Sequence, residues 1–138
     1  MLEEALASVR QVAQQLAADE DRYAALGTAL RALPPLGAVT IARGSSDHAA
    51  AYFAYLVMSR TGQLVTSLPM SLLTLYKAPL AKQRLLAVSI SQSGRSPDLI
   101  EPMQVFESAG ATTVALVNDT NSPLAEAVDW AMPLHAGP

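Results

Sequence analysis

Two short stretches rich in serine and glycine carry the side chains best suited to bind a ligand. The first reads RGSSD at residues 43–47, and the second reads SQSGRSPD at residues 91–98. Each follows a short apolar run and precedes an amphipathic stretch, which is typical of a turn between a strand and a helix. Serine hydroxyls and the free N–H groups of a helix N-terminus donate hydrogen bonds, and the helix dipole adds about half a positive charge. These groups predict an anion site that needs no lysine.

A phosphate group is the anion that fits such a site. Hydrogen bonds to a charged partner contribute about 1.5–3 kcal/mol each. Three or four of them hold a phosphate monoester with about micromolar affinity, after the cost of association is subtracted. A chain of net charge −3 can therefore still bind phosphate locally.

Alternating strands and helices are expected to position the two stretches. Residues 1–34 have the three- and four-residue spacing of helix, and Pro34-Pro35 ends it. One apolar stripe in this segment contains Leu2, Leu6, Val9, Val12, Ala13 and Leu16. Strands are then expected at residues 38–42, 64–66, 85–90, 112–117 and 130–132. Helices are expected between them, at residues 46–60, 69–76, 97–109 and 123–127.

This alternation predicts a three-layer α/β/α sandwich around a five-stranded parallel sheet in the flavodoxin-like order 2-1-3-4-5. Residues 1–34 form an N-terminal helical segment, and residues 35–138 form the domain. Ser96-Pro97 and Ser122-Pro123 each place a hydroxyl at the N-cap and a proline at the first helical position. In this strand order the chain reverses between the first and third strands, where ligands bind. The two serine-rich stretches follow those two strands.

Composition limits the classes of protein that the chain can represent. Hydrophobic residues make up 51% and charged residues 15%, against about 25% charged in most domains, so the chain is not disordered. Part of its apolar surface is expected to contact a partner chain. The net charge of −3 argues against nucleic-acid binding. The chain has no cysteine, no signal-peptide pattern and no apolar run long enough for a membrane span, so we expect a cytoplasmic protein without a membrane partner.

Other chemical motifs are absent or weak. The sequence has neither a P-loop nor a GxGxxG turn, and SQSG differs from the GxSxG turn of α/β-hydrolases. With only two histidines, His48 and His135, no metal or cofactor is expected. Arg43 and Arg95 flank the serine-rich stretches, where they either contact phosphate or act as ordinary surface residues.

The strand and loop at residues 39–46 (VTIARGSS) and at residues 89–98 (SISQSGRSPD) resemble the sugar isomerase (SIS) domain family. The resemblance covers about residues 35–138. Within the family, these residues are similar to the isomerase part of glutamine–fructose-6-phosphate aminotransferases and to glucosamine-6-phosphate deaminases. Two positions differ, because Arg43 stands where many of the synthases have cysteine and Arg95 where they have glutamate.

The resemblance implies a phosphosugar site. The residues implied to bind the 6-phosphate are Ser46, Ser91, Gln92, Ser93 and Ser96. Those implied to contact the sugar are Gly44 and Ser45. The catalytic glutamate, histidine and lysine of such enzymes are expected to lie beyond this sequence or on another subunit.

The leading hypothesis is therefore the phosphosugar-binding module of a hexose or hexosamine 6-phosphate isomerase, isomerizing aminotransferase or deaminase, paired as a homodimer. Two alternatives stay open. One is a phosphosugar sensor without catalysis, and the other is a structural dimerisation domain. The first alternative predicts binding without turnover, and the second predicts neither.

Overall fold

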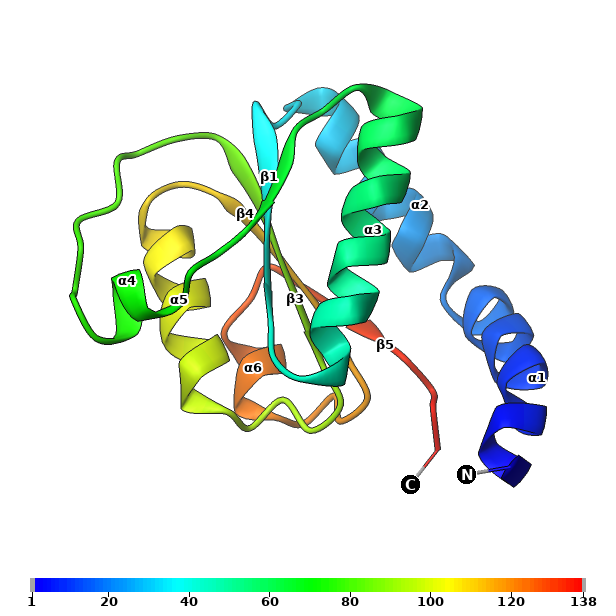
Figure 1. Ribbon diagram of the computed structural model, residues 1–138. Coiled ribbons are helices and arrows are strands. Elements are labelled where there is room, and N and C mark those ends of the chain that lie inside the picture. The colour runs from blue at the N-terminus through cyan, green and yellow to red at the C-terminus, as the bar shows by residue number, and fades with distance from the viewer. Residues whose placement is uncertain (1, 138) are drawn as a thin grey trace.

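A five-stranded parallel sheet forms the centre of the protein (Figure 1). The computed structural model describes residues 2–137, and the side chains of residues 6–137. The strands are β1 (Gly37–Ala42), β2 (Val65–Ser67), β3 (Leu85–Ser91), β4 (Thr112–Val117) and β5 (Trp130–Pro133). They lie in the order β2-β1-β3-β4-β5, and every neighbouring pair is parallel. The predicted strand order is confirmed.

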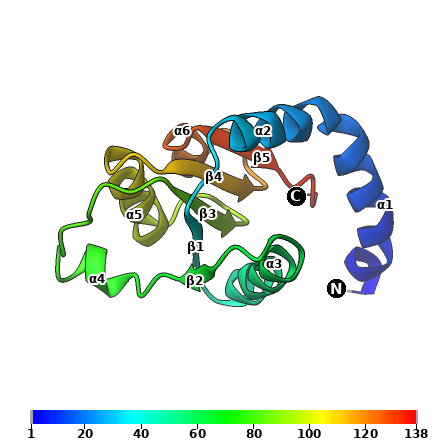
Figure 2. The ribbon, with the colours of Figure 1, turned by 90° about the horizontal axis from the view of Figure 1, so that it is seen from above.

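Helices cover both faces of this sheet, as Figure 2 shows. The helices are α1 (Leu2–Ala18), α2 (Glu20–Ala32), α3 (Ser45–Thr61), α4 (Ser71–Thr74), α5 (Pro97–Ser108) and α6 (Pro123–Glu126). Side chains of α4, α5 and α6 pack on one face, and those of α2 and α3 pack on the other. The predicted three-layer α/β/α sandwich is therefore confirmed.

The core explains why β3 lies in the middle of the sheet. Ala87 of β3 packs with Met103 and Phe106 of α5, and the next residue, Val88, packs with Phe53 of α3 on the opposite face. Successive side chains of a strand point to opposite faces, so a strand covered on both sides must be apolar at consecutive positions. The unbroken run Leu85–Val88 meets that requirement.

The first helix of the N-terminal helical segment does not pack on the sheet. The segment is divided at Asp19 into α1 and α2, and α1 extends away from the sheet (Figures 1 and 2). The predicted apolar stripe of α1 faces solvent, with Leu6 73% and Val9 80% exposed. The side chain of Leu2 lies outside the described side chains. A covering partner for this stripe remains a prediction.

The C-terminal segment holds α1 in place through polar contacts. Gln15 Nε2 donates to the carbonyl of Pro133 at 2.8 Å, and Gln11 Nε2 donates to the carbonyl of Ala136 at 3.2 Å. Where the helical segment divides, the Asp19 carboxylate lies 2.7 Å from Nε2 of His135. The division of the helix therefore coincides with its attachment to the end of the chain.

Candidate functional site

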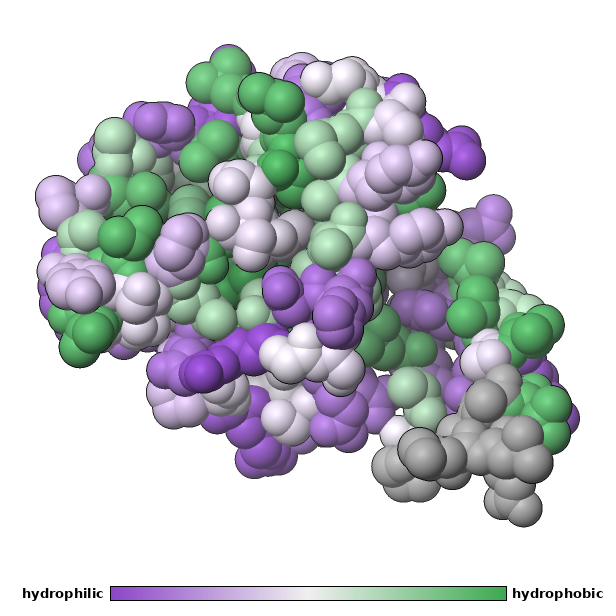
Figure 3. Space-filling model, in the orientation of Figure 1, coloured by the Kyte–Doolittle hydropathy of each residue, from purple (hydrophilic) through white to green (hydrophobic). Residues whose placement is uncertain are grey.

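The two serine-rich stretches lie side by side at one edge of the sheet. β1 and β3 are parallel and paired from Gly37 opposite Leu85 to Ala42 opposite Ile90, so their carboxyl ends coincide. Both loops lie at the lower edge of Figure 1, and hydrophilic side chains gather along that edge in Figure 3. The Arg43 guanidinium also contacts the Asp98 carboxylate, which joins the two loops directly.

The first loop turns at Gly44 and leads into α3. Gly44 has φ +58° and ψ −134°, a conformation open to glycine, and a Cβ atom there would meet no atom within 4 Å. Gly44 is also the N-cap of α3, so no side chain caps that helix. Ser45 is exposed and Ser46 is half-buried in the first turn of α3. The start of α3 therefore presents amides and hydroxyls beside open space.

The second loop is held tightly at Gly94. This residue has φ +63°, and its amide donates to Oγ of Ser91 at 3.0 Å. The amide of Leu124 in turn donates to the carbonyl of Gly94 at 3.0 Å. A Cβ atom on Gly94 would lie 2.1 Å from Oγ of Ser122, so only glycine fits here. The loop is thereby fixed against the start of α6.

Hydrogen-bond donors remain unused where this loop enters α5. Ser96 is the N-cap of α5, but its side chain forms no hydrogen bond to the helix. The amides of Leu99 and Ile100 are taken by the carbonyl of Ser96. Within residues 2–137, the backbone N–H groups of Ser93 and Ser96 have no acceptor. These groups can therefore donate to an anion placed at the start of α5.

The two arginines beside the loops are each paired with a carboxylate. Arg43 contacts Asp98 in the first turn of α5, and Nη2 of Arg95 lies 2.8 Å from Oδ2 of Asp119 in the loop after β4. The hydrogen bond from Arg95 lowers the pKa of Asp119 below its ordinary value, and the amide of Asn121 lowers that pKa further. Each guanidinium charge is thus compensated at the surface by a carboxylate of the same chain.

The structure brings every predicted site residue to this one edge, with different exposure. The exposed ones are Gly44, Ser45, Gln92 and Ser93. Ser46 and Ser96 are half-buried, whereas Ser91 is buried. Because Oγ of Ser91 accepts the Gly94 amide, Ser91 also shapes the loop. The phosphate-binding roles of these residues remain predictions.

Sequence patterns missed the contacts that depend on residues far apart in the chain. Asp98 follows a Ser-Pro cap and has the pattern of an ordinary acidic residue in a first turn, yet it pairs with Arg43 across the loops. Ser122 has the same Ser-Pro pattern as Ser96, but it is completely buried against the second loop. No local signal in the sequence distinguishes these cases.

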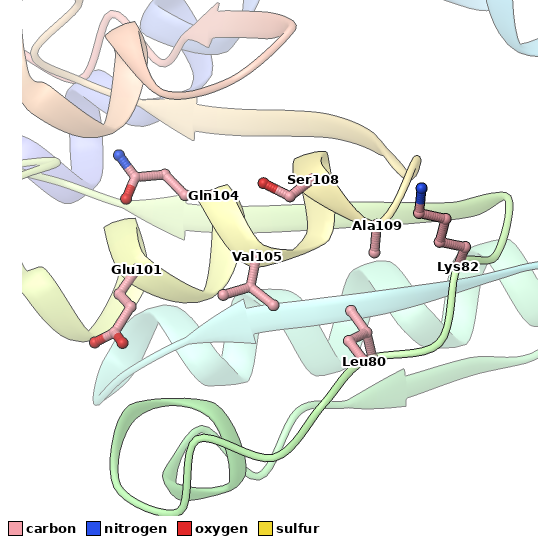
Figure 4. A pocket seen from close by; sticks show the side chains of 7 residues that line it. All are labelled: Leu80, Lys82, Glu101, Gln104, Val105, Ser108 and Ala109. Carbon is pink, nitrogen blue, oxygen red and sulfur yellow. The ribbon is translucent and has the colours of Figure 1, made fainter.

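A separate hollow of about 340 Å³ lies between α5 and the segment before β3 (Figure 4). It is lined by Leu80, Lys82, Glu101, Gln104, Val105, Ser108 and Ala109. These side chains come from α5, the residue after it and the segment before β3, and none is a predicted site residue.

Among the side chains of residues 6–137, no three His, Cys, Asp or Glu residues are grouped to hold a metal ion. No helix within residues 2–137 is long and apolar enough to cross a membrane.

Two curated relatives are similar to this chain in sequence. A glutamine–fructose-6-phosphate aminotransferase (isomerizing) of Sulfolobus acidocaldarius is 36% identical over 100 residues, which are 72% of this chain and 16% of that protein. An uncharacterized HTH-type transcriptional regulator of Caldanaerobacter subterraneus is 38% identical over 79 residues, which are 57% of this chain and 28% of that protein. The chain thus spans a small part of both relatives.

A solved structure shares the whole arrangement of helices and strands. It is a protein of Silicibacter pomeroyi assigned as a phosphosugar isomerase, with a TM-score of 0.94 and 36% identity over 99% of this chain and 42% of that chain. The model of the SIS domain family matches residues 38–138, which include the sheet except the first residue of β1, both serine-rich loops and α5. From the shared sequence, fold and loops together, this chain belongs to the SIS domain family.

Proposed function

We propose that residues 35–138 are the phosphosugar-binding domain of an enzyme that acts on a hexose or hexosamine 6-phosphate. The observation that supports this function best is the pair of loops at the carboxyl ends of β1 and β3, with unused donors at the starts of α3 and α5. Hydroxyls and main-chain amides that converge at a helix N-terminus favour phosphate over other groups. The SIS family membership is consistent with this ligand.

In this proposal the phosphate and the sugar lie on different parts of the edge. The phosphate accepts hydrogen bonds from hydroxyls and amides, namely those of Ser46, Ser91, Gln92, Ser93 and Ser96. The sugar lies beside Gly44 and Ser45, because open space surrounds the Cα of Gly44.

The proposed chemical step is aldose–ketose interconversion coupled to amino transfer or deamination. Such a step requires a base at C1 and C2 of the open sugar. We assign that base to chain outside this domain or to a second subunit.

A homodimer is the second part of the proposal. The exposed stripe of α1 supports it, because isolated apolar side chains are ordinary on a surface but a continuous stripe on one helix is not. The stripe includes Leu6, Val9, Val12 and Leu16, each more than half exposed. Sedimentation of the chain and of a Leu6→Ser/Val9→Ser variant tests the dimer. A monomer at micromolar concentration for the unaltered chain would contradict it.

Calorimetric titration with glucosamine 6-phosphate and fructose 6-phosphate tests the ligand. We expect Kd values in the micromolar range, and about ten-fold weaker binding for Ser93→Ala, since one hydrogen bond to the phosphate is lost. Ser108→Ala, at the opposite end of α5, is the matched control and keeps the affinity. Glucosamine without phosphate should not bind. Absence of binding at millimolar phosphosugar would overturn the proposal.

A phosphosugar-binding module without turnover is the second candidate. The likeness to an HTH-type transcriptional regulator favours it, because such a protein has use for a ligand-binding domain that performs no reaction. Both candidates predict binding, and turnover separates them. Ammonia release from glucosamine 6-phosphate, or conversion between the aldose and ketose phosphates, is expected only if the chain belongs to an enzyme and its catalytic residues are present.

A further inference from the structure

An arginine from the first loop neutralises an aspartate at the entrance to α5. Nη1 of Arg43 contacts Oδ2 of Asp98. Arg43 directly follows β1 and Asp98 is the second residue of α5, so the pair spans the space between the two loops. The side chains are 57% and 43% exposed. Ion pairs this exposed contribute little to the stability of the fold.

Asp98 is, by its charge, an unfavourable residue for a phosphate site. The start of a helix attracts anions through its free N–H groups and its dipole, whereas a carboxylate in the same turn repels them. A phosphate monoester carries about −1.5 to −2 charge at neutral pH, which makes that repulsion larger. The amide of Ser96 and the carboxylate of Asp98 lie two residues apart at this helix start. Compensation of the Asp98 charge therefore strengthens phosphate binding by these amides.

We propose that Arg43 is the charge-compensating residue of the phosphate site. It acts through Asp98 and not by touching the ligand, and it allows the N-terminus of α5 to attract a phosphosugar. This inference rests on the proposed function, because it concerns how the same site tolerates a carboxylate. It also gives Arg43 a role that a small uncharged residue at that position cannot fill.

A second ion pair on α5 provides a matched control. Lys77 contacts Glu101, which lies one helical turn further along α5 than Asp98. The two side chains are 63% and 43% exposed, nearly the same as in the Arg43–Asp98 pair. Removing Lys77 therefore also leaves an unpaired carboxylate on this helix, but away from its N-terminus.

Titration of glucosamine 6-phosphate into a set of charge variants at low salt tests the inference. We expect Arg43→Ala to raise Kd about ten-fold and Asp98→Asn to lower it a few-fold. The double variant Arg43→Ala/Asp98→Asn should bind within about two-fold of the unaltered chain, since its charge at the loops is restored. Lys77→Ala should keep the affinity. Near 0.5 M salt the Arg43→Ala effect should shrink, because exposed charges are screened.

Three results would decide against the inference while leaving the proposed function intact. A double variant as weak as Arg43→Ala would mean that Arg43 binds the ligand or holds the loop itself. An Arg43→Ala variant that binds like the unaltered chain would mean that the pair does not matter. Tighter binding by Arg43→Ala would reverse the expected sign. If the unaltered chain binds no phosphosugar, the proposed function fails as well. Circular dichroism of each variant verifies that it is folded.

Discussion

Two helices of this protein begin with the same Ser-Pro dipeptide, and their serines have different surroundings. Ser122 at the start of α6 is completely buried, and its Oγ accepts the amide of Ala125 at 3.4 Å. Ser96 at the start of α5 is half-buried, and its hydroxyl caps no amide. Identical local sequence therefore gives one closed helix start and one open helix start. The open one lies at the edge where β1 and β3 end, beside the unused donors.

Tertiary packing therefore decides whether a capping hydroxyl is available to a ligand. Ser122 is enclosed because Gly94 of the second loop presses against it, and Val117 of β4 borders the same space. By contrast, a Cβ atom on Gly44 of the first loop would meet no atom within 4 Å, so this glycine is not pressed against another helix start. The packed glycine, Gly94, and the unpacked glycine, Gly44, both lie in the predicted turns.

The largest effect is expected from Gly94→Ala, which breaks the contact between the second loop and Ser122. The new Cβ would lie 2.1 Å from Oγ of Ser122 and 2.9 Å from Cγ2 of Val117, at φ +63°. We expect the free energy of unfolding to fall by about 3–5 kcal/mol, from overpacking and backbone strain together. Urea denaturation measures this change.

Gly110→Ala is the control for Gly94→Ala. Gly110 also has a positive φ, +84°, but a Cβ atom there would meet no atom within 4 Å. Strain alone should therefore cost about 1–2 kcal/mol. Equal losses for the two variants would show that the second loop is not pressed against Ser122.

Ser96→Ala separates the contribution of this hydroxyl to ligand binding from its contribution to stability. Its hydroxyl forms no cap, so the free energy of unfolding should change by less than about 0.5 kcal/mol. The Kd for glucosamine 6-phosphate should rise about 10- to 100-fold, since a hydrogen bond to a charged group contributes about 1.5–3 kcal/mol. Calorimetry and urea denaturation of one preparation give both values. A loss of stability with unchanged affinity would assign Ser96 to the helix alone.

Ser122→Ala, unlike Ser96→Ala, is expected to lower stability and to leave the affinity for phosphosugar nearly unchanged. The cap on the Ala125 amide is lost, which should lower the free energy of unfolding by about 1 kcal/mol. Because Ser122 is enclosed by protein, we expect the Kd for phosphosugar to change less than two-fold. Thermal unfolding and calorimetry check the two values. Weaker binding than in Ser96→Ala would reverse the assignment of open and closed helix starts.

The smallest effect on stability is expected from the ion pair between Arg95 of the second loop and Asp119, which lies in the loop before α6. The pKa of Asp119 lies below its ordinary value of 3.8 in the folded protein, chiefly because of the hydrogen bond from Arg95. A carboxylate whose pKa is lower in the folded protein than in the unfolded protein stabilises the fold at pH values above its pKa in the unfolded protein. This stabilisation is lost as the pH falls through the pKa that the carboxylate has in the folded protein. We therefore expect the Tm difference between the unaltered chain and Asp119→Asn to shrink below about pH 4. A difference that stays constant down to pH 2.5 would contradict this.

The sheet could be predicted closely from the sequence because its signals are local. The apolar run Leu85–Val88 indicates a strand that is buried on both faces, and the prolines after Ser96 and Ser122 indicate helix starts. The predicted strand at 64–66 lies one residue earlier than β2, and the predicted helix at 69–76 is reduced to α4. Both differences occur between Gln63 and Leu85, where one three-residue strand and one four-residue helix leave most of the backbone irregular.

The candidate site could be predicted in place but not in detail. Loops after β1 and β3 must meet at one edge in this strand order, so the position of the serines followed from topology. The Arg43–Asp98 contact joins residues 55 positions apart, and the contact of Asp19 with His135 joins residues 116 apart. Such pairs leave no periodic pattern in the sequence. The hydrogen bond from the Gly94 amide to Oγ of Ser91 could not be predicted from the sequence either.

Amide chemical shifts during titration with glucosamine 6-phosphate test the phosphate site most directly. The largest shifts are expected at the amides of Ser45, Ser46, Ser93 and Ser96, at the starts of α3 and α5. Glucosamine without phosphate should leave them in place. Shifts centred instead on the hollow beside Leu80 and Val105, or no shifts at millimolar ligand, would contradict a phosphosugar site between the two serine-rich loops.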